Sequence, residues 1–241
     1  MSGLRGAALG LAAGALGGLL TGVAAPQGNG VEDDSAQVIV QKARKALDEA
    51  KSVRMQAQVE DAAGTTTLDL RFDVDGNCTG AVGLPGNGGH ADIVKRGEDV
   101  WLKPDAKFFQ SQIPGASGKD AAELINGRWI HGSTRNALLH EFSEVCDLSG
   151  FQRKYASRPA SESLAKGGKA TVDGAKAITV TSRSEDESST YYVATEGKPR
   201  LLRVEGRQDG QKGKADFSDY DKPVPAGTPR PGESVDLSQL Q

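Results

Sequence analysis

The sequence has few of the residues from which catalytic and metal sites are built. Its 241 residues include three histidines and two cysteines, and His90, His131 and His140 occur without HxH or HExxH spacing. A Gly-x-Ser-x-Gly nucleophile motif is also absent. A serine, a histidine and an aspartate brought together from distant positions remain the enzymatic alternative. We therefore expect a protein that is not an enzyme and that has no metal site and no cofactor.

The chain also lacks any concentration of charge of one sign. Its 29 basic and 32 acidic residues give a net charge of -3 and are spread along the sequence. Because nucleic-acid binding needs a basic patch, we expect no nucleic-acid partner. Aromatic residues make up 5% and the broader apolar set 37%, which is modest for a globular protein but too high for a disordered one. About 190 residues remain once the N-terminal signal and tether and the C-terminal tail, described below, are left out. That is enough for one domain, and we expect the protein to be a monomer.

An uncharged run rich in glycine, alanine and leucine, residues 6–20, follows Arg5. It has the form of the apolar core of a signal peptide. The run is too short and too rich in glycine for a membrane-spanning helix, which needs about 20 strongly apolar residues. Its glycines also disfavour the alternative of a buried N-terminal helix. We therefore expect residues 1–25 to be an export signal. Residues 26–34, with the sequence PQGNGVEDD, are expected to form a flexible tether.

The end of the uncharged run carries an incomplete bacterial lipobox. Leu20, Thr21 and Gly22 match its first three positions, but Val23 stands where the lipidated cysteine belongs. Valine has no sulfur with which to form the thioether to diacylglycerol, so we expect no lipidation at Val23. The chain is expected to be exported and then released, or held at the outer face of the plasma membrane by an uncleaved signal.

A helix is predicted directly after the tether. Asp34 or Ser35 can cap its N-terminus, and apolar residues then recur at a spacing of three to four from Ile39 to Ala50. This spacing is typical of an amphipathic helix of about four turns. Its apolar face must pack against the rest of the domain.

Alternation of apolar and polar residues predicts two groups of antiparallel strands separated by a helical insert. The first group comprises residues 53–59, 68–74, 78–84, 90–97 and 99–103. The insert, from about residue 105 to about residue 157, contains short helical patterns that begin at capping residues. The second group comprises residues 169–174, 175–183, 189–197, 199–207 and 214–220. Residues 223–241, with four prolines, are expected to be an extended C-terminal tail.

These patterns predict an α+β fold in which a single domain spans residues 35–222. About ten antiparallel strands would form a large curled sheet, a half-barrel, or a closed barrel. The apolar face of the sheet would be covered by the N-terminal helix and the helical insert. Cys78 lies in the third predicted strand and Cys146 in the insert. In an exported chain such a pair favours a disulfide, which would attach the insert to the sheet.

Three features of the sequence resemble a known group of proteins. They are NCTGAVG with its cysteine partner in EVCDL, the run YYVATEGKPRLLRVEG, and the closing ADFSDYDKPV. Together with the lipobox remnant, they are similar to the LppX/LprG-type lipoproteins of actinobacteria, which are relatives in fold of the LolA/LolB lipoprotein carriers. The resemblance implies a half-barrel wrapped round helices, with an apolar cavity that binds a lipid or a lipidated molecule in the cell envelope.

The alternating residues of four predicted strands are the candidates for lining such a cavity. Alternation places apolar residues of one strand on a common face, but it does not say which face is concave. A structural or protein-interaction module of the cell surface, with a filled core, is the alternative function. The candidate lining residues are Leu68, Leu70, Phe72, Ile178, Val180, Tyr192, Leu202 and Val204.

Overall fold

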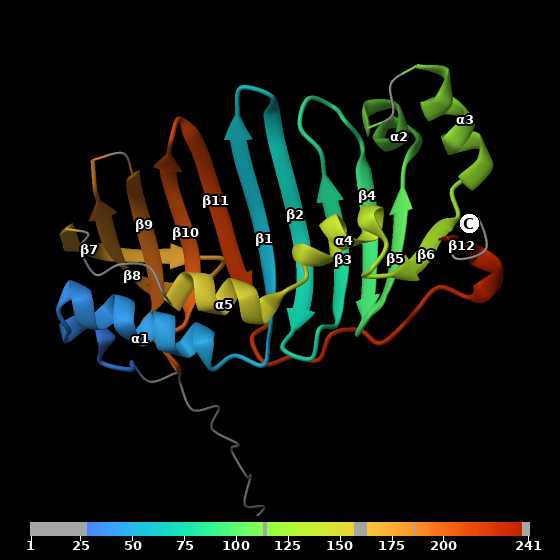
Figure 1. Ribbon diagram of the computed structural model, residues 1–241. Coiled ribbons are helices and arrows are strands. Elements are labelled where there is room, and N and C mark those ends of the chain that lie inside the picture. The colour runs from blue at the N-terminus through green and yellow to red at the C-terminus, as the bar shows by residue number, and fades with distance from the viewer. Residues whose placement is uncertain (1–27, 113–114, 157–162, 186, 238–241) are drawn as a thin grey trace, which may run out of the picture.

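One curled sheet of 12 strands dominates the computed structural model, which describes residues 28–112, 115–156, 163–185 and 187–237 (Figure 1). The sheet is open, with the strand order β12-β6-β5-β4-β3-β2-β1-β11-β10-β9-β8-β7. All of its pairings are antiparallel except that of β12 with β6. The α+β half-barrel expected from the sequence is thereby confirmed. The predicted signal peptide and the lipobox remnant at Leu20–Val23 lie outside the described residues.

The two predicted groups of strands meet at the centre of the sheet, where β1 pairs with β11. The first group and the strand of the insert are β1 (Ser52–Asp61), β2 (Gly64–Asp73), β3 (Cys78–Gly83), β4 (His90–Arg96), β5 (Asp99–Pro104) and β6 (Trp129–Ser133). The second group and the final strand are β7 (Ser163–Val172), β8 (Ala175–Arg183), β9 (Glu187–Ala194), β10 (Leu201–Gln208), β11 (Gln211–Ser218) and β12 (Ser234–Asp236).

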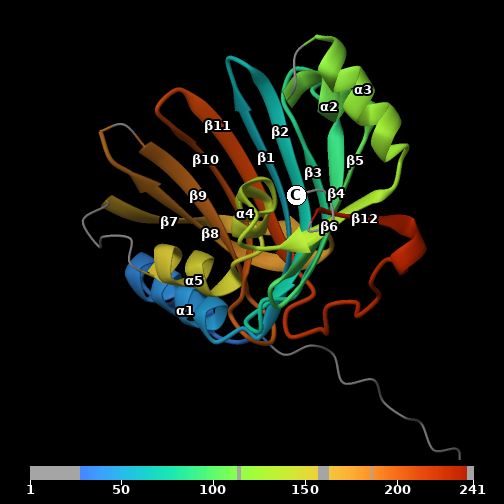
Figure 2. The same cartoon turned by 45° about the vertical axis from the view of Figure 1, so that its right-hand side comes forward.

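Five helices are present in the described residues: α1 (Ala36–Asp48), α2 (Ala106–Gln112), α3 (Ala116–Ile125), α4 (Ala137–Glu144) and α5 (Leu148–Ala156). The side chain of Ser35 caps α1 by accepting a hydrogen bond from the Val38 amide. The buried face of α1 includes Ile39 and Leu47 and packs against β7 to β10. Helix α5 contacts α1 and β2, while α4 contacts β5 and β6. Figure 2 shows the sheet curving round α1, α4 and α5, which lie on its concave side.

The core fills the space between the sheet and these helices. The Phe151 ring of α5 lies 6.4 Å from the Phe72 ring of β2 and 6.0 Å from the Phe217 ring of β11, measured between ring centroids. Because Phe72 and Phe217 come from strands on either side of β1, this aromatic cluster attaches α5 to the middle of the sheet. Helices α1 and α5 lie over the lower part of the concave face (Figure 1).

The predicted disulfide is confirmed. Cys78 of β3 and Cys146, which follows α4, are bonded with their Cα atoms 5.6 Å apart, and both residues are fully buried. The bond joins the helical insert directly to the sheet.

The structure differs from the expectation of about ten strands at two positions. Strand β6 interrupts the insert that was predicted to be helical, and β12 lies in the predicted C-terminal tail. Before β12 the chain runs along the lower edge of the sheet (Figure 1), where the Arg96 guanidinium donates to the Pro225 carbonyl. Residues 234–236 then add a parallel strand beside β6. A strand of three residues is too short to produce a recognisable alternation.

The segment predicted to be a tether also packs on the domain where it is described. A short 3-10 helix, η1, spans Val31–Asp33, and the Val31 side chain within it is 1% exposed. The Lys166 ammonium of β7 donates to the Glu32 and Asp34 carbonyls. Isolated apolar residues such as Val31 carry no periodic pattern, which is why the sequence did not reveal this contact.

Candidate functional site

The concave face carries a groove of about 250 Å³ near the ends of its central strands. Figure 1 shows that the upper ends of β1, β10 and β11 project beyond α1 and α5. The groove lies over these strands and β9. Its floor is formed by Ala57, Val59, Ser189, Val204, Gly206, Gly213 and Ala215.

Strand register explains why the floor is flat. Val59 of β1 lies opposite Gly213 of β11, which lies opposite Gly206 of β10, which in turn lies opposite Ser189 of β9. Side chains at paired positions of neighbouring strands point to the same face of a sheet. A row with two glycines and a serine therefore forms a strip of backbone and small side chains. Val59 remains 37% exposed there.

The two glycines of the floor differ in the space around them. A Cβ atom on Gly206 would lie 2.6 Å from the Ser188 carbonyl oxygen, so a side chain cannot be added there without moving the backbone. A Cβ atom on Gly213 would lie 3.8 Å from its nearest neighbour, an ordinary contact. The groove can therefore be filled from Gly213 without strain.

One end of the groove is polar. Glu187, Gln208 and Gln211 border it where β9, β10 and β11 turn. The other end is apolar, at Ala57, Val204 and Ala215, and adjoins the core. An apolar floor with a charged and amide border suits an amphiphile, whose chain would lie on the floor with its head at the strand ends.

The structure divides the predicted lining residues into three groups. Leu70, Phe72, Ile178 and Val180 are buried in the core beneath the helices. Leu68 and Val204 are partly buried on the same concave face, and Val204 lines the groove. Tyr192 and Leu202 were predicted to line the same face, but the strand register does not place them there. The reason differs between the two residues.

Tyr192 lies on the outer, convex face. Register places Tyr191, not Tyr192, beside Val180 and Val204. Leu202 falls at a register shift between Leu201 and Arg203, and Leu201 takes the fully buried position. Because the two tyrosines are adjacent, and the two leucines likewise, the apolar–polar alternation fits equally well whichever residue of each pair faces the core. Only the pairing with neighbouring strands decides between them.

Sequence reasoning missed the residues that make the floor, above all Gly206 and Gly213. Glycine contributes no apolar side chain, so an analysis of apolar alternation passes over it. Gly206 lies inside the predicted strand 199–207, and Gly213 directly precedes the predicted strand 214–220. The signal that could have located Gly206 is its place inside a strand, since glycine there weakens the strand unless close approach or space is needed.

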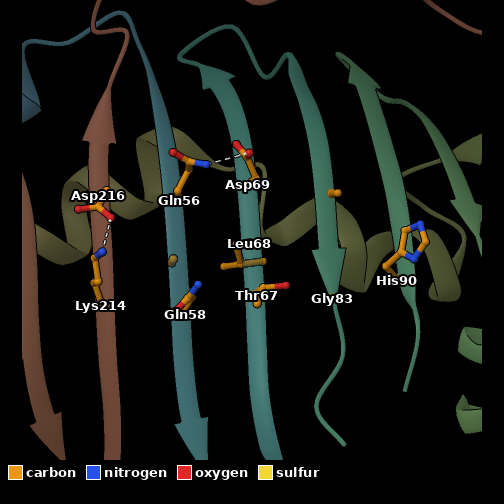
Figure 3. Close-up of a pocket in the computed structure, with 11 residues that line it drawn as sticks. Gln56, Gln58, Thr67, Leu68, Asp69, Gly83, His90, Lys214 and Asp216 are labelled. Atoms are coloured by element: carbon orange, nitrogen blue, oxygen red, sulfur yellow. Dashed lines mark hydrogen bonds and ion pairs between the residues drawn. The ribbon is translucent and has the colours of Figure 1, made fainter. Parts of the chain in front are cut away.

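The outer face has a polar groove of about 400 Å³, which Figure 3 shows from the side away from the helices. Two pairs of its side chains interact: Gln56 of β1 donates to Asp69 of β2 at 3.1 Å, and the Lys214 ammonium lies 3.1 Å from the Asp216 carboxylate. The Arg54 guanidinium donates two hydrogen bonds to Asp69 and holds the pKa of that carboxyl below its usual value. This face therefore offers satisfied polar groups rather than an apolar surface.

Tyr192 belongs to the same outer network. Its hydroxyl donates to the Glu205 carboxylate at 3.3 Å, and the Arg203 guanidinium lies 5.9 Å from the centroid of its ring. Partial burial, with the negative charge of Glu205, raises the pKa of Tyr192.

The three histidines lie on different elements, each beside a carboxylate. His90 of β4 is 2.8 Å from Asp105, and His140 of α4 is 3.8 Å from Glu144. His131 of β6 lies between Asp99 and Asp236, at 3.3 and 3.4 Å, and stacks on Trp101. Across the described ranges, no three His, Cys, Asp or Glu side chains are grouped as a metal site would require.

None of the helices in the described ranges combines the length and the apolar character needed to cross a membrane.

Comparison of the sequence with protein-family models and with curated protein sequences found no match. Comparison of the structure with solved structures found two informative similarities. LprF from Mycobacterium bovis is 12% identical, with a TM-score of 0.57 over 80% of this chain and 96% of LprF. Lipoprotein LppX from Mycobacterium tuberculosis is 13% identical, with a TM-score of 0.52 over 80% of this chain and 98% of LppX. The fold is that of LprF and LppX. The fold expected from the resemblance in sequence is therefore confirmed.

Proposed function

We propose that this chain is a non-enzymatic protein of the cell envelope that binds a lipid or a lipidated molecule, with one apolar chain lying in the concave groove. The observation that carries the proposal is the groove itself, which has an apolar floor of small side chains and a polar end. The fold shared with two mycobacterial proteins, one of them described as a lipoprotein, supports the same assignment.

The size of the groove limits what it can hold. Each methylene removed from water contributes about 0.8 kcal/mol, so even a short length of acyl chain supplies useful binding energy. Pockets for drug-sized ligands usually measure about 300–1,000 Å³, and the groove measures about 250 Å³. The ligand in this proposal is therefore a single chain lying along the floor, with the rest of the molecule outside.

The proposal also includes export of the chain across the plasma membrane. The uncharged run at residues 6–20 and the incomplete lipobox at Leu20–Val23 support secretion. The exported chain in this proposal is a monomer that is released, or is held at the outer face of the plasma membrane by an uncleaved signal.

A second candidate function is a structural or protein-interaction module. It is favoured by the tight burial of Leu70, Phe72, Ile178 and Val180, which fill the position where the resemblance implied a cavity. Under this alternative the groove is a shallow surface feature that stays empty in solution.

Lipid content of the purified protein decides between the two functions. The protein is produced in an actinobacterial host, purified without detergent, and measured by native mass spectrometry and by organic extraction. We expect close to one bound lipid per chain. Replacing Gly213 with leucine should reduce that occupancy at least ten-fold, because the side chain fills the groove from a position with room for it.

The matched control is Gly168→Leu, which adds the same side chain on β7 where nothing lies within 4 Å. This variant should retain its lipid. Wild-type protein that is repeatedly empty, or equal occupancy in the two variants, would reject the proposal and favour the interaction module.

A further inference from the structure

The phenol hydroxyl of Tyr191 is buried without a hydrogen-bond partner in the described part of the chain. Tyr191 lies in the middle of β9, and its side chain is 1% exposed. Buried polar atoms are nearly always hydrogen-bonded, because burial removes the water that would otherwise satisfy them. An exception therefore calls for an explanation, such as a bound water or a ligand.

The neighbouring tyrosines show that this is not a general property of this half of the sheet. Tyr220 is also buried, and its hydroxyl donates to the Leu201 carbonyl at 2.7 Å. Tyr192, the next residue along β9, donates to Glu205. Tyr191 alone of these three is left without a partner.

Tyr191 adjoins the inner end of the groove. Ser189, two residues earlier on the same face of β9, lines the groove. Val204, directly opposite Tyr191 on β10, also lines it. Tyr191 itself belongs to the buried core cluster, so its unpartnered hydroxyl lies in the part of the core that adjoins these lining residues, at the end of the groove opposite to Glu187, Gln208 and Gln211.

We infer that Tyr191 is the residue that selects the ligand, by hydrogen-bonding to an oxygen atom carried within the buried chain. This inference rests on the proposed function. The oxygen belongs to a neutral group, such as a hydroxyl, a ketone or an ester, because a carboxylate would have to lose its hydration among apolar side chains. The ligand class is therefore an amphiphile with a polar head at the strand ends and a second, uncharged oxygen further along its chain.

Binding of two matched probes tests the inference. The probes are stearic acid and a set of hydroxystearic acids that differ in the position of the hydroxyl, titrated into delipidated full-length protein. Wild-type protein should bind at least one hydroxystearic acid about three-fold to ten-fold more tightly than stearic acid, the usual effect of one neutral hydrogen bond. Tyr191→Phe should lose the preference, so that the ratio of its affinities for the hydroxystearic acid and for stearic acid falls to about one.

The control variant is Tyr192→Phe, the same change one residue further on and on the outer face. It should keep the wild-type preference. In the ligand-free protein, Tyr191→Phe should leave the melting temperature unchanged or raise it by about 2–4 °C, because it removes a buried hydroxyl that has no partner.

Three results would overturn the inference while leaving the proposed function intact: a wild type with no preference, a Tyr191→Phe variant that keeps the preference, or a lower melting temperature for the ligand-free variant. Wild-type protein that binds neither probe would instead reject the proposed function, and this inference with it.

Discussion

The disulfide between Cys78 and Cys146 connects a central strand to the loop between two helices, with the Cα atoms 5.6 Å apart. Strand β3 lies in the middle of the first group of strands, whereas α4 and α5 rest on the concave face. The bond closes a loop across a sequence separation of 68 residues. It therefore restricts the unfolded chain and holds the insert on the sheet.

Removal of this disulfide should weaken the domain. Replacing both Cys78 and Cys146 with serine is expected to lower the free energy of unfolding by about 2–5 kcal/mol, as loss of a native disulfide typically does. Urea unfolding followed by tryptophan fluorescence gives the value. Reduced wild-type protein is the control and should behave like the double variant, whereas equal stability of the oxidised wild type and the variant would contradict the prediction.

The side chain of Gln152 joins α5 to the end of α1. Its amide donates to the Leu47 and Ala50 carbonyls, both at 2.9 Å, and the residue is buried. Gln152→Leu keeps a side chain of similar size but removes both hydrogen bonds; the Leu47 carbonyl still accepts from the Ala50 amide, whereas the Ala50 carbonyl loses its Gln152 partner. We expect the free energy of unfolding to fall by about 1–3 kcal/mol. Gln110→Leu, at an exposed position of α2, should change it by less than about 0.5 kcal/mol, and a similar effect of both changes would argue against this role.

Acid should weaken the Arg54–Asp69 pair. The two hydrogen bonds from Arg54, at 2.8 and 2.6 Å, lower the pKa of Asp69 from its ordinary value of 3.8. Because the pKa is lower in the folded state, the pair stabilises the protein above pH 4 or so and loses this effect as the pH falls through the folded-state value. The Asp69 side chain is 44% exposed, so solvent screening limits the contribution to about 1 kcal/mol or less.

Thermal unfolding of Asp69→Asn as a function of pH tests this prediction. The variant should be less stable than the wild type near neutral pH, and the difference should shrink as the pH falls from about 5 towards 2. Asp120→Asn, at an exposed position of α3, should show no such trend. A difference that persists unchanged at low pH would mean that Asp69 acts through something other than its charge.

Strand β12 should protect the edge of the sheet. It pairs with β6, and Asp236 within it lies 3.4 Å from His131. A chain that ends at Arg230 exposes the backbone groups of β6, and exposed edges of this kind pair with other chains. We expect dimers or larger species in size-exclusion chromatography with light scattering. A chain that ends at Leu237 is the control and should stay monomeric, and two equally monomeric truncations would refute the protective role.

The sequence by itself determined the elements whose signals are local. Ser35 caps a helix whose apolar residues recur from Ile39 to Leu47, as predicted, because capping and periodicity depend only on nearby residues. The alternation that predicted the strands follows in the same way from the two-residue repeat of an extended chain. Two cysteines in a chain expected from its sequence to be exported were enough to predict their bond.

Only the tertiary structure decided which residues face the groove. The choice between Tyr191 and Tyr192 depends on register with β8 and β10, and a shift of one residue reverses every side chain of a strand. The burial of Val31 and the addition of β12 likewise arise from contacts between segments far apart in the chain. Register, burial and edge pairing are set by long-range packing, which leaves no periodic pattern in the residues themselves.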